Sequence, residues 1–201
     1  MTGERTRVGT ERGPGRPREE RVTGAVLNAV VDLVVEQGMG ALTMDAVAAR
    51  AGVSKPAIYR RWPTKQDLVI AAAESRIGEL SVPDLGDFRA ELRVVLTARL
   101  KAYRLPGSAR LIAGLIGAAA EAGPGRAQYA QYTERITSET RHILERGIAR
   151  GDVRPDTDVR AAATLVAAPL LFRLIGEQEL PDTRLVETLV DLVSRAVGSA
   201  S

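Results

Sequence analysis

The side chains best suited to chemistry gather in the stretch AGVSKPAIYRRWPTK, residues 51–65. If this stretch is helical, Lys55 and Tyr59 are one turn apart and share a face, with Pro56 and Arg60 beside them. Lys and Arg neutralise phosphates or donate hydrogen bonds to guanine, and a tyrosine hydroxyl can donate to a phosphate. The spacing therefore indicates a surface that binds a polyanion.

Four further residues would widen this surface. Ala57 is small enough to let the helix backbone approach a ligand closely, and Arg61 and Lys65 extend the cationic side chains past the end of the helix. Thr43 lies at the start of the preceding helix, where it can contact a phosphate on the other side. The full set would contact the backbone and the base edges of a nucleic acid.

Two short helices and a glycine turn would position these side chains. Thr43 can cap a helix over residues 43–51, and Gly52 suits the left-handed turn that follows it. Ser54 is expected to cap the next helix, with its hydroxyl accepting a hydrogen bond from the backbone N–H of Ala57. Helix, tight turn and helix in this order form the helix-turn-helix pattern, in which the second helix enters the DNA major groove.

The opposite face of the second helix, predicted over residues 54–62, is apolar. Ile58 and Trp62 are four residues apart and are expected to pack inwards, and Pro63 ends the helix. A short helix with basic residues is more often just a solvated surface. Here the glycine turn, Pro56 in the first helical turn and the tyrosine occur in one register, which favours DNA recognition.

The longer stretch ALTMDAVAARAGVSKPAIYRRWPTKQDLVIAAA resembles the DNA-binding domain of the TetR family of bacterial regulators. The matching positions are Leu42, Thr43, Ala48, Ala51, Gly52, Val53, Ser54, Ile58, Tyr59, Trp62, Pro63 and Lys65. Arg60 and Arg61 stand where the family often has His, and Trp62 stands where Phe is commoner. The resemblance implies an all-α fold, with an N-terminal three-helix helix-turn-helix domain and a larger C-terminal helical bundle for dimerisation and ligand binding. It also implies the family's usual role, which is repression relieved by a small molecule.

The composition divides the chain into three parts. Residues 1–20 are rich in Arg, Glu, Gly and Pro, and we expect them to form a disordered arm. Helical periodicity begins at Arg21, so the DNA-binding domain is expected over residues 21–68, continuing into a connecting helix to about residue 80, with the bundle over 81–201. Residues 1–65 hold eleven Lys/Arg and seven Asp/Glu, whereas residues 66–201 hold seventeen and eighteen. The basic end is therefore the end expected to meet double-stranded DNA.

The arm contains RGPGRPR, residues 12–18. A Gly-Arg-Pro core flanked by arginines is similar to the minor-groove hook of architectural proteins, and arginine suits a narrow A·T minor groove. We therefore expect Arg16 and Arg18 to add affinity for DNA, although the alternative is a solvated leader without a partner. The same segment raises an alternative for the whole protein, a non-sequence-specific architectural nucleic-acid-binding protein.

Residues 81–201 are predicted to form helices over about 87–103, 109–121, 127–150, 158–176 and 183–197. The last two are the most apolar, and in similar proteins the final helices pair with a second copy, although some of their residues must belong to the core. The expected homodimer contacts are Ala161, Leu165, Ala168, Phe172, Leu185, Leu189, Leu192 and Val193. A two-fold dimer would place two recognition helices about one DNA turn (~34 Å) or a multiple apart, matching a palindromic operator.

The stretch LIAGLIGAAAEAG, residues 111–123, is rich in small residues, which allow either close helix packing or a gap. The sequence alone favours close packing, whereas the family resemblance favours a pocket for an unknown effector among the middle helices. The expected lining is Leu96, Leu100, Tyr103, Leu111, Leu115, Tyr132 and Ile136. Few charges fall on these faces, so a mostly apolar small molecule is predicted.

The composition leaves little for catalysis. There is no cysteine and one histidine, His142, which excludes thiol chemistry, Cys-ligated zinc and a multi-histidine metal site, and no phosphate-binding loop is recognisable. We therefore predict no enzyme activity, no metal and no cofactor. The N-terminus lacks an apolar signal segment, and the longest apolar run, residues 161–172, is too short to cross a bilayer. These features predict a cytoplasmic protein without a membrane partner.

Overall fold

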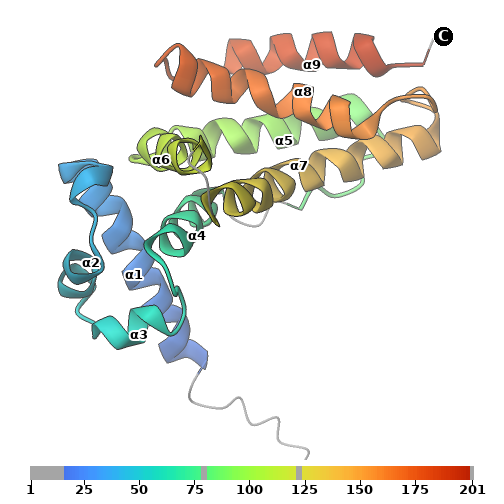
Figure 1. Cartoon of the computed structure of the whole chain (residues 1–201). Helices are drawn as coiled ribbons and strands as arrows, with labels where there is room; N and C mark the ends of the chain where they lie inside the picture. Colours follow the sequence, from blue (N-terminus) through green and yellow to red (C-terminus); the bar gives the residue numbers. More distant parts are fainter. Residues whose placement is uncertain (1–15, 78–80, 121–123, 200–201) are drawn as a thin grey trace, which may run out of the picture.

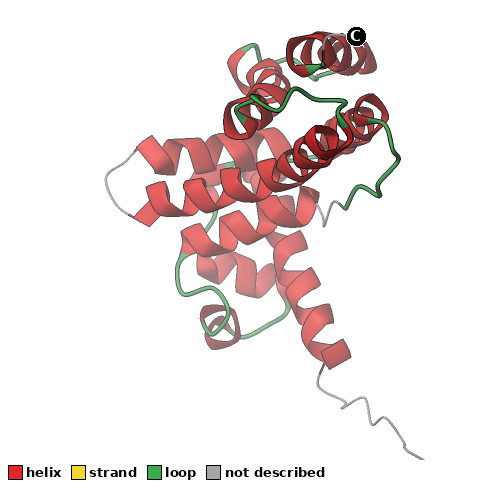
Figure 2. Cartoon of the chain, turned by 90° about the vertical axis from the view of Figure 1, so that its right-hand side faces the viewer, coloured by secondary structure: helices red, strands yellow, loops and turns green. Residues whose placement is uncertain are grey.

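A computed structural model of the chain describes residues 16–77, 81–120 and 124–199. Within these ranges the chain forms helices and no strand, which confirms the predicted all-α class (Figures 1 and 2). The elements are α1 (Arg16–Gln37), the 3-10 turn η1 (Met39–Ala41), α2 (Met44–Ala51), α3 (Lys55–Tyr59), α4 (Lys65–Ile77), α5 (Phe88–Tyr103), α6 (Ser108–Ala120), α7 (Pro124–Arg150), α8 (Val159–Leu171), the π-helical turn η2 (Phe172–Gly176) and α9 (Thr183–Val197).

The first three helices form a small unit at one end of the molecule (Figure 1). α1 buries Val26, Val30 and Val34, which are spaced four residues apart and therefore share a face. Val47 of α2 and Ile58 of α3 are also without exposed surface. Each helix thus contributes apolar residues to the core that holds the unit together.

α4 connects this unit to the rest of the chain. Thr64 and Asp67 cap its start reciprocally: the Thr64 N–H donates to the Asp67 carboxylate at 2.9 Å, and the Asp67 N–H donates to the Thr64 hydroxyl at 3.1 Å. Leu68 and Ala72 are fully buried, and α4 packs on α1 as well as on α6 and α7. α4 therefore contacts both parts of the molecule.

Helices α5 to α9 form the larger part. In Figure 1, α8 and α9 lie on the side of α5 and α7 that is farthest from α3. Leu92 and Leu96 of α5, Leu144 of α7 and Leu170 of α8 have no exposed surface. The buried apolar residues of this part and of the first three helices belong to one continuous cluster.

A buried carboxylate holds the segment between α4 and α5 against the bundle. Glu91 has no exposed surface and accepts a hydrogen bond from the Leu85 N–H at 2.9 Å. Its two oxygens also lie 3.2 Å from the guanidinium groups of Arg146 and Arg150 on α7. Because burying an unpaired charge is costly, these contacts hold Glu91 in place.

α1 begins earlier than predicted. It starts at Arg16, and Pro17 fits its first turn because a proline there gives up no helical hydrogen bond. Glu19 in the same turn favours the start of a helix through its negative charge. The predicted arm of residues 1–20 is therefore wrong for its last five residues, and residues 1–15 lie outside the described part of the chain.

Candidate DNA-binding site

The turn between α2 and α3 is built around Gly52. Its φ of 65° lies in the left-handed region, which glycine adopts without the steric cost of a Cβ. The N–H groups of Gly52 and Val53 both donate to the Ala48 carbonyl and close α2. The predicted hydroxyl cap at Ser54 is wrong, because its backbone carbonyl accepts the hydrogen bond from the Ala57 N–H, at 2.9 Å.

α3 separates an anchored face from an exposed face. Ile58 is fully buried and Trp62 nearly so, whereas Tyr59 keeps 43% of its surface exposed. Pro56 and Arg60 are exposed as well. The Arg60 N–H donates to the Pro56 carbonyl at 3.1 Å, and the Trp62 N–H donates to the Ile58 carbonyl at 2.9 Å. The helical turn therefore continues past Tyr59. The polar side of α3 therefore faces away from the protein's core.

Lys55 is held beside α2 by an acidic partner. Its Nζ lies 2.9 Å from the carboxylate of Asp45, in the first turn of α2, and both side chains are substantially exposed. The hydrogen bond to Asp45 raises the pKa of Lys55. The sequence analysis did not include Asp45, although its position two residues after Thr43 is typical of an acidic residue at a helix start.

The remaining predicted contacts surround α3. Thr43 is exposed, and its hydroxyl accepts from the Ala46 N–H at 3.1 Å, which caps α2. Ala57 and Lys65 are half-buried. The Arg61 guanidinium lies 3.6 Å from the Glu19 carboxylate of α1, which links α1 to the end of α3. These residues come from α2, α3 and the start of α4.

A second ion pair fixes α2 relative to α1. Arg50 makes two hydrogen bonds to the Glu36 carboxylate, at 2.9 and 2.6 Å. This bidentate contact raises the pKa of Arg50 and lowers that of Glu36. The two residues are fourteen positions apart in the chain, so helical spacing alone gave no indication of the pair.

The two arginines assigned to the arm lie in the first turn of α1. Arg16 and Arg18 are helical in their backbone, whereas the positions of their side chains lie outside the described part of the chain. A contact of these residues with a minor groove stays a prediction.

Two stretches of the chain match known protein families. Residues 26–72 match the family described as bacterial regulatory proteins, tetR family, and residues 82–193 match the tetracyclin repressor-like C-terminal domain. The chain belongs to the TetR family. It is therefore a transcriptional regulator of TetR type whose helix-turn-helix binds DNA.

Relatives and solved structures agree with this assignment. The uncharacterized HTH-type transcriptional regulator YdeS of Bacillus subtilis (strain 168) is 31% identical over 163 residues, covering 80% of this chain and 82% of the relative. A TetR transcriptional regulator from Agrobacterium tumefaciens superposes with a TM-score of 0.68 at 25% identity, covering 89% of this chain and 95% of the other. The regulator FadR from Bacillus subtilis, solved in complex with stearoyl-CoA, shares the fold with a TM-score of 0.65 at 17% identity, covering 87% and 98%.

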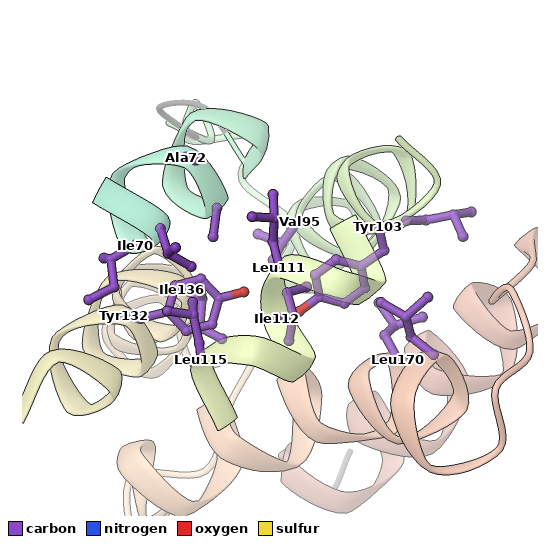
Figure 3. Packing of buried hydrophobic residues seen from close by; sticks show 14 of the residues in the cluster. Ile70, Ala72, Val95, Tyr103, Leu111, Ile112, Leu115, Tyr132, Ile136 and Leu170 are labelled. Atoms are coloured by element: carbon purple, nitrogen blue, oxygen red, sulfur yellow. The ribbon is translucent and has the colours of Figure 1, made fainter. Parts of the chain in front are cut away.

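In this TetR-family chain the residues expected to line a ligand pocket are all buried and come from α5, α6 and α7. Figure 3 shows five of them side by side: Tyr103, Leu111, Leu115, Tyr132 and Ile136. The other two, Leu96 and Leu100, lie on the same helix as Tyr103 and are also buried.

The void beside this group is small, and a charged residue is buried close to the group. A void of about 10 Å³ touches Tyr103, Arg76 and Ile112, which is room for about one water molecule. One charge does fall on these faces, because Arg99 is buried on α5 between Leu96 and Tyr103. A charged residue at helical spacing within an apolar stripe was visible in the sequence.

The residues predicted for a dimer interface divide into two sets. Leu165, Phe172 and Leu192 expose 53%, 64% and 57% of their surface, and Ala161 and Ala168 are also exposed. Leu185 is half-buried. Leu189 and Val193 are buried in the chain's own core, so their assignment to the interface is wrong.

One described helical stretch, Val159–Gly176, is long and apolar enough to cross a membrane by length and composition alone. It is longer than the apolar run recognised in the sequence because η2 continues α8 to Gly176. A third of it is buried inside the protein, and α8 packs on α7 and α9. Its apolar residues are therefore partly used for packing within the bundle.

Proposed function

We propose that the protein is a homodimeric repressor that binds a palindromic operator and is released from it by a small molecule. The observation that carries the proposal is the polarity of α3, with Ile58 and Trp62 buried behind an exposed Tyr59 and Arg60. In this scheme residues 21–68, with the connecting helix that the sequence predicts to about residue 80, bind DNA, and residues 81–201 dimerise and bind the effector. The protein works in the cytoplasm, where the chromosome is.

The proposed DNA contacts fall into two groups. Lys55, Tyr59 and Arg60 enter the major groove with the small Pro56 and Ala57 between them, since α3 is the second helix of the helix-turn-helix. Phosphates are contacted by Thr43, Arg61 and Lys65 at the edges of this surface, and Arg16 and Arg18 add affinity from the minor groove. The Asp45 carboxylate competes with a phosphate or a base for the ammonium group of Lys55.

The proposed dimer uses the exposed apolar residues of α8, η2 and α9. Leu165, Phe172 and Leu192 are large apolar side chains on helices that lie away from α3 (Figure 1). Exposed apolar residues gathered on neighbouring helices are typical of protein–protein contacts. Pairing through this side would leave both α3 helices free to face one DNA duplex.

Effector release requires that the bundle and the DNA-binding helices move together. α4 contacts both parts, and α6 holds the end of α1 through Arg110, whose guanidinium donates to the carbonyls of Val34 and Val35. A ligand that separates the helices around Tyr103 would displace α4 or α6, since the void there is only about 10 Å³. The ligand shifts the population away from the DNA-binding arrangement only if it binds the displaced arrangement of the helices more tightly. FadR, which shares the fold, was solved with stearoyl-CoA, which supports a ligand site in bundles of this kind.

Footprinting on the DNA upstream of the protein's own gene and its neighbours tests the proposal. We expect one protected region with two inverted half-sites, and loss of protection in Tyr59→Ala. Protection without any sequence preference, competed equally by unrelated duplexes, would favour the alternative of an architectural nucleic-acid-binding protein. A reporter gene behind the protected promoter distinguishes repression from activation.

A further inference from the structure

Arg99 is a buried cation whose charge has no carboxylate partner. Only 3% of its surface is exposed. Its Nη2 donates to the Thr140 hydroxyl at 2.7 Å and to the Ile136 carbonyl, both on α7, whereas its Nη1 has no hydrogen-bond partner. Among the residues that the structure describes, no Asp or Glu forms an ion pair with Arg99, and burial lowers its pKa.

Two buried phenols lie near this guanidinium. Tyr103 and Tyr132 expose almost no surface, and Figure 3 shows their hydroxyls pointing toward one another from α5 and α7. Each hydroxyl affects the pKa of the other through a mutual contact that falls short of good hydrogen-bond geometry, and neither has another partner in the described chain. Burial raises the pKa of both phenols, so both remain neutral hydrogen-bond donors at physiological pH.

These unpaired groups are expensive to keep if they serve only the fold. Buried polar atoms are normally satisfied, and a buried charge is normally paired. A purely structural role explains the two contacts of Nη2, which tie α5 to α7, but it does not explain the free Nη1 or two buried hydroxyls that have only each other. One cation and two neutral donors, in a buried apolar cluster that includes Leu96, Leu100 and Leu111, match an acceptor-rich anion attached to an apolar body.

We propose that the effector of this protein is a small molecule with a carboxylate head and an apolar body, and that Arg99, Tyr103 and Tyr132 bind the carboxylate. This inference rests on the proposed effector site and revises the mostly apolar ligand predicted from the sequence. The carboxylate supplies the negative charge that Arg99 lacks, and its oxygens accept hydrogen bonds from Nη1 and the phenols. Leu96, Leu100 and the neighbouring leucines of α6 receive the apolar body.

Calorimetric titration of the full chain tests this directly. The probes are straight-chain carboxylates of six to twelve carbons, each compared with the alcohol of the same length. We expect carboxylates to bind at least about tenfold more tightly than the matched alcohols, because charge-assisted hydrogen bonds are stronger than neutral ones. Arg99→Met should abolish this preference. Arg93→Met is the matched control, because Arg93 lies on the same helix but pairs with Glu187 at the surface.

Three results would overturn the proposal: equal binding of carboxylate and alcohol, a preference that survives in Arg99→Met, or no binding by any chain length. Thermal unfolding without ligand provides an independent measurement. Arg99→Met also removes the two bonds of Nη2 to α7, so this measurement checks that the variant is folded at the temperature of the titration. If that variant does not fold, Tyr132→Phe is used instead, with an expected severalfold loss of the carboxylate preference.

Operator binding separates this inference from the proposed function. If carboxylates bind through Arg99 but leave the operator complex intact, the anion site stands and effector-controlled release fails. If the protein shows no operator at all, the calorimetric result still decides the role of Arg99. If another molecule releases the operator while Arg99→Met responds to it like the unmodified chain, the carboxylate proposal is wrong and the regulator proposal stands.

Discussion

Lys55 and Asp45 allow one strong test of the DNA-binding surface. Replacing Lys55 should lower the affinity for DNA, whereas replacing Asp45 should raise it. Lys55→Gln removes a cation from the exposed face of α3. Asp45→Asn removes the carboxylate that lies 2.9 Å from Lys55 and frees the lysine for DNA. Both side chains are substantially exposed, so neither substitution is expected to disturb folding.

The size of the effect follows from counterion release. Each neutralised phosphate contributes about 0.9 to the slope of log affinity against log salt concentration. A dimer carries Lys55 twice, so Lys55→Gln should reduce the slope by about 1.8 if both copies contact phosphates. Between 50 and 200 mM salt, this difference corresponds to about a tenfold smaller loss of affinity. Asp45→Asn should instead raise the affinity at low salt by roughly two- to fivefold.

Fluorescence anisotropy with a labelled operator duplex, measured at several salt concentrations, gives both the affinity and the slope. Arg195→Gln is the matched control, because Arg195 is an exposed cation on α9, on the side of the molecule away from α3 (Figure 1). A slope that stays the same in Lys55→Gln, or that falls equally in Arg195→Gln, would show that Lys55 does not contact the phosphates.

Three further predictions concern stability and assembly. Glu91→Ala leaves two arginines beside a buried gap and is expected to lower the free energy of unfolding by about 2–4 kcal/mol in urea denaturation. Gly107→Ala should lower it by about 1–3 kcal/mol, since φ is +83° and a Cβ would meet Val35 at 2.9 Å, whereas Gly117→Ala, with open space around it, should raise it by roughly 0.5–1 kcal/mol. Phe172→Glu should give a folded monomer in sedimentation equilibrium, because that side chain is 64% exposed; a dimer that persists would place the interface elsewhere.

The helix-turn-helix was predictable because its signals are local. Gly52 at a left-handed turn, Thr43 at a helix start and the four-residue spacing of Ile58 and Trp62 each specify backbone geometry within a few residues. The cap at Ser54 was less predictable, because its hydroxyl and its carbonyl can both accept from the same N–H. Local rules therefore predicted that Ser54 begins α3, but not which of its oxygens accepts the hydrogen bond.

The dimer surface was only partly predictable, since periodicity does not say which side of an apolar helix faces the protein. Leu192 and Val193 are neighbours in the sequence, yet Leu192 is 57% exposed and Val193 only 2%. Successive residues in a helix point about 100° apart, so a wide apolar stripe contains both core and surface positions. Only the packing of α9 against α5 and α8 separates the two.

Arg99 was overlooked for a different reason. α5 carries several cations, among them Arg89, Arg93 and Lys101, and most of them are at the surface. Arg99 stands three residues after Leu96 and four before Tyr103, which places it on the apolar face. Position relative to the helical stripe was therefore more informative than the number of charges on the helix.

The composition suggested a DNA-binding domain and a separate bundle from residue 81, yet the two parts do not have separate cores. The buried residues from α1 to α9 belong to one cluster, and the turn just before α6 approaches α1 so closely that a Cβ at Gly107 would collide with Val35. Arg110 also bonds the carbonyls at the end of α1. Close-packed contacts transmit displacement, since they cannot be compressed without strain. A ligand that moves α6 must therefore either move α1 or break the Arg110 bonds, which gives the bundle a route to the DNA-binding helices in addition to α4.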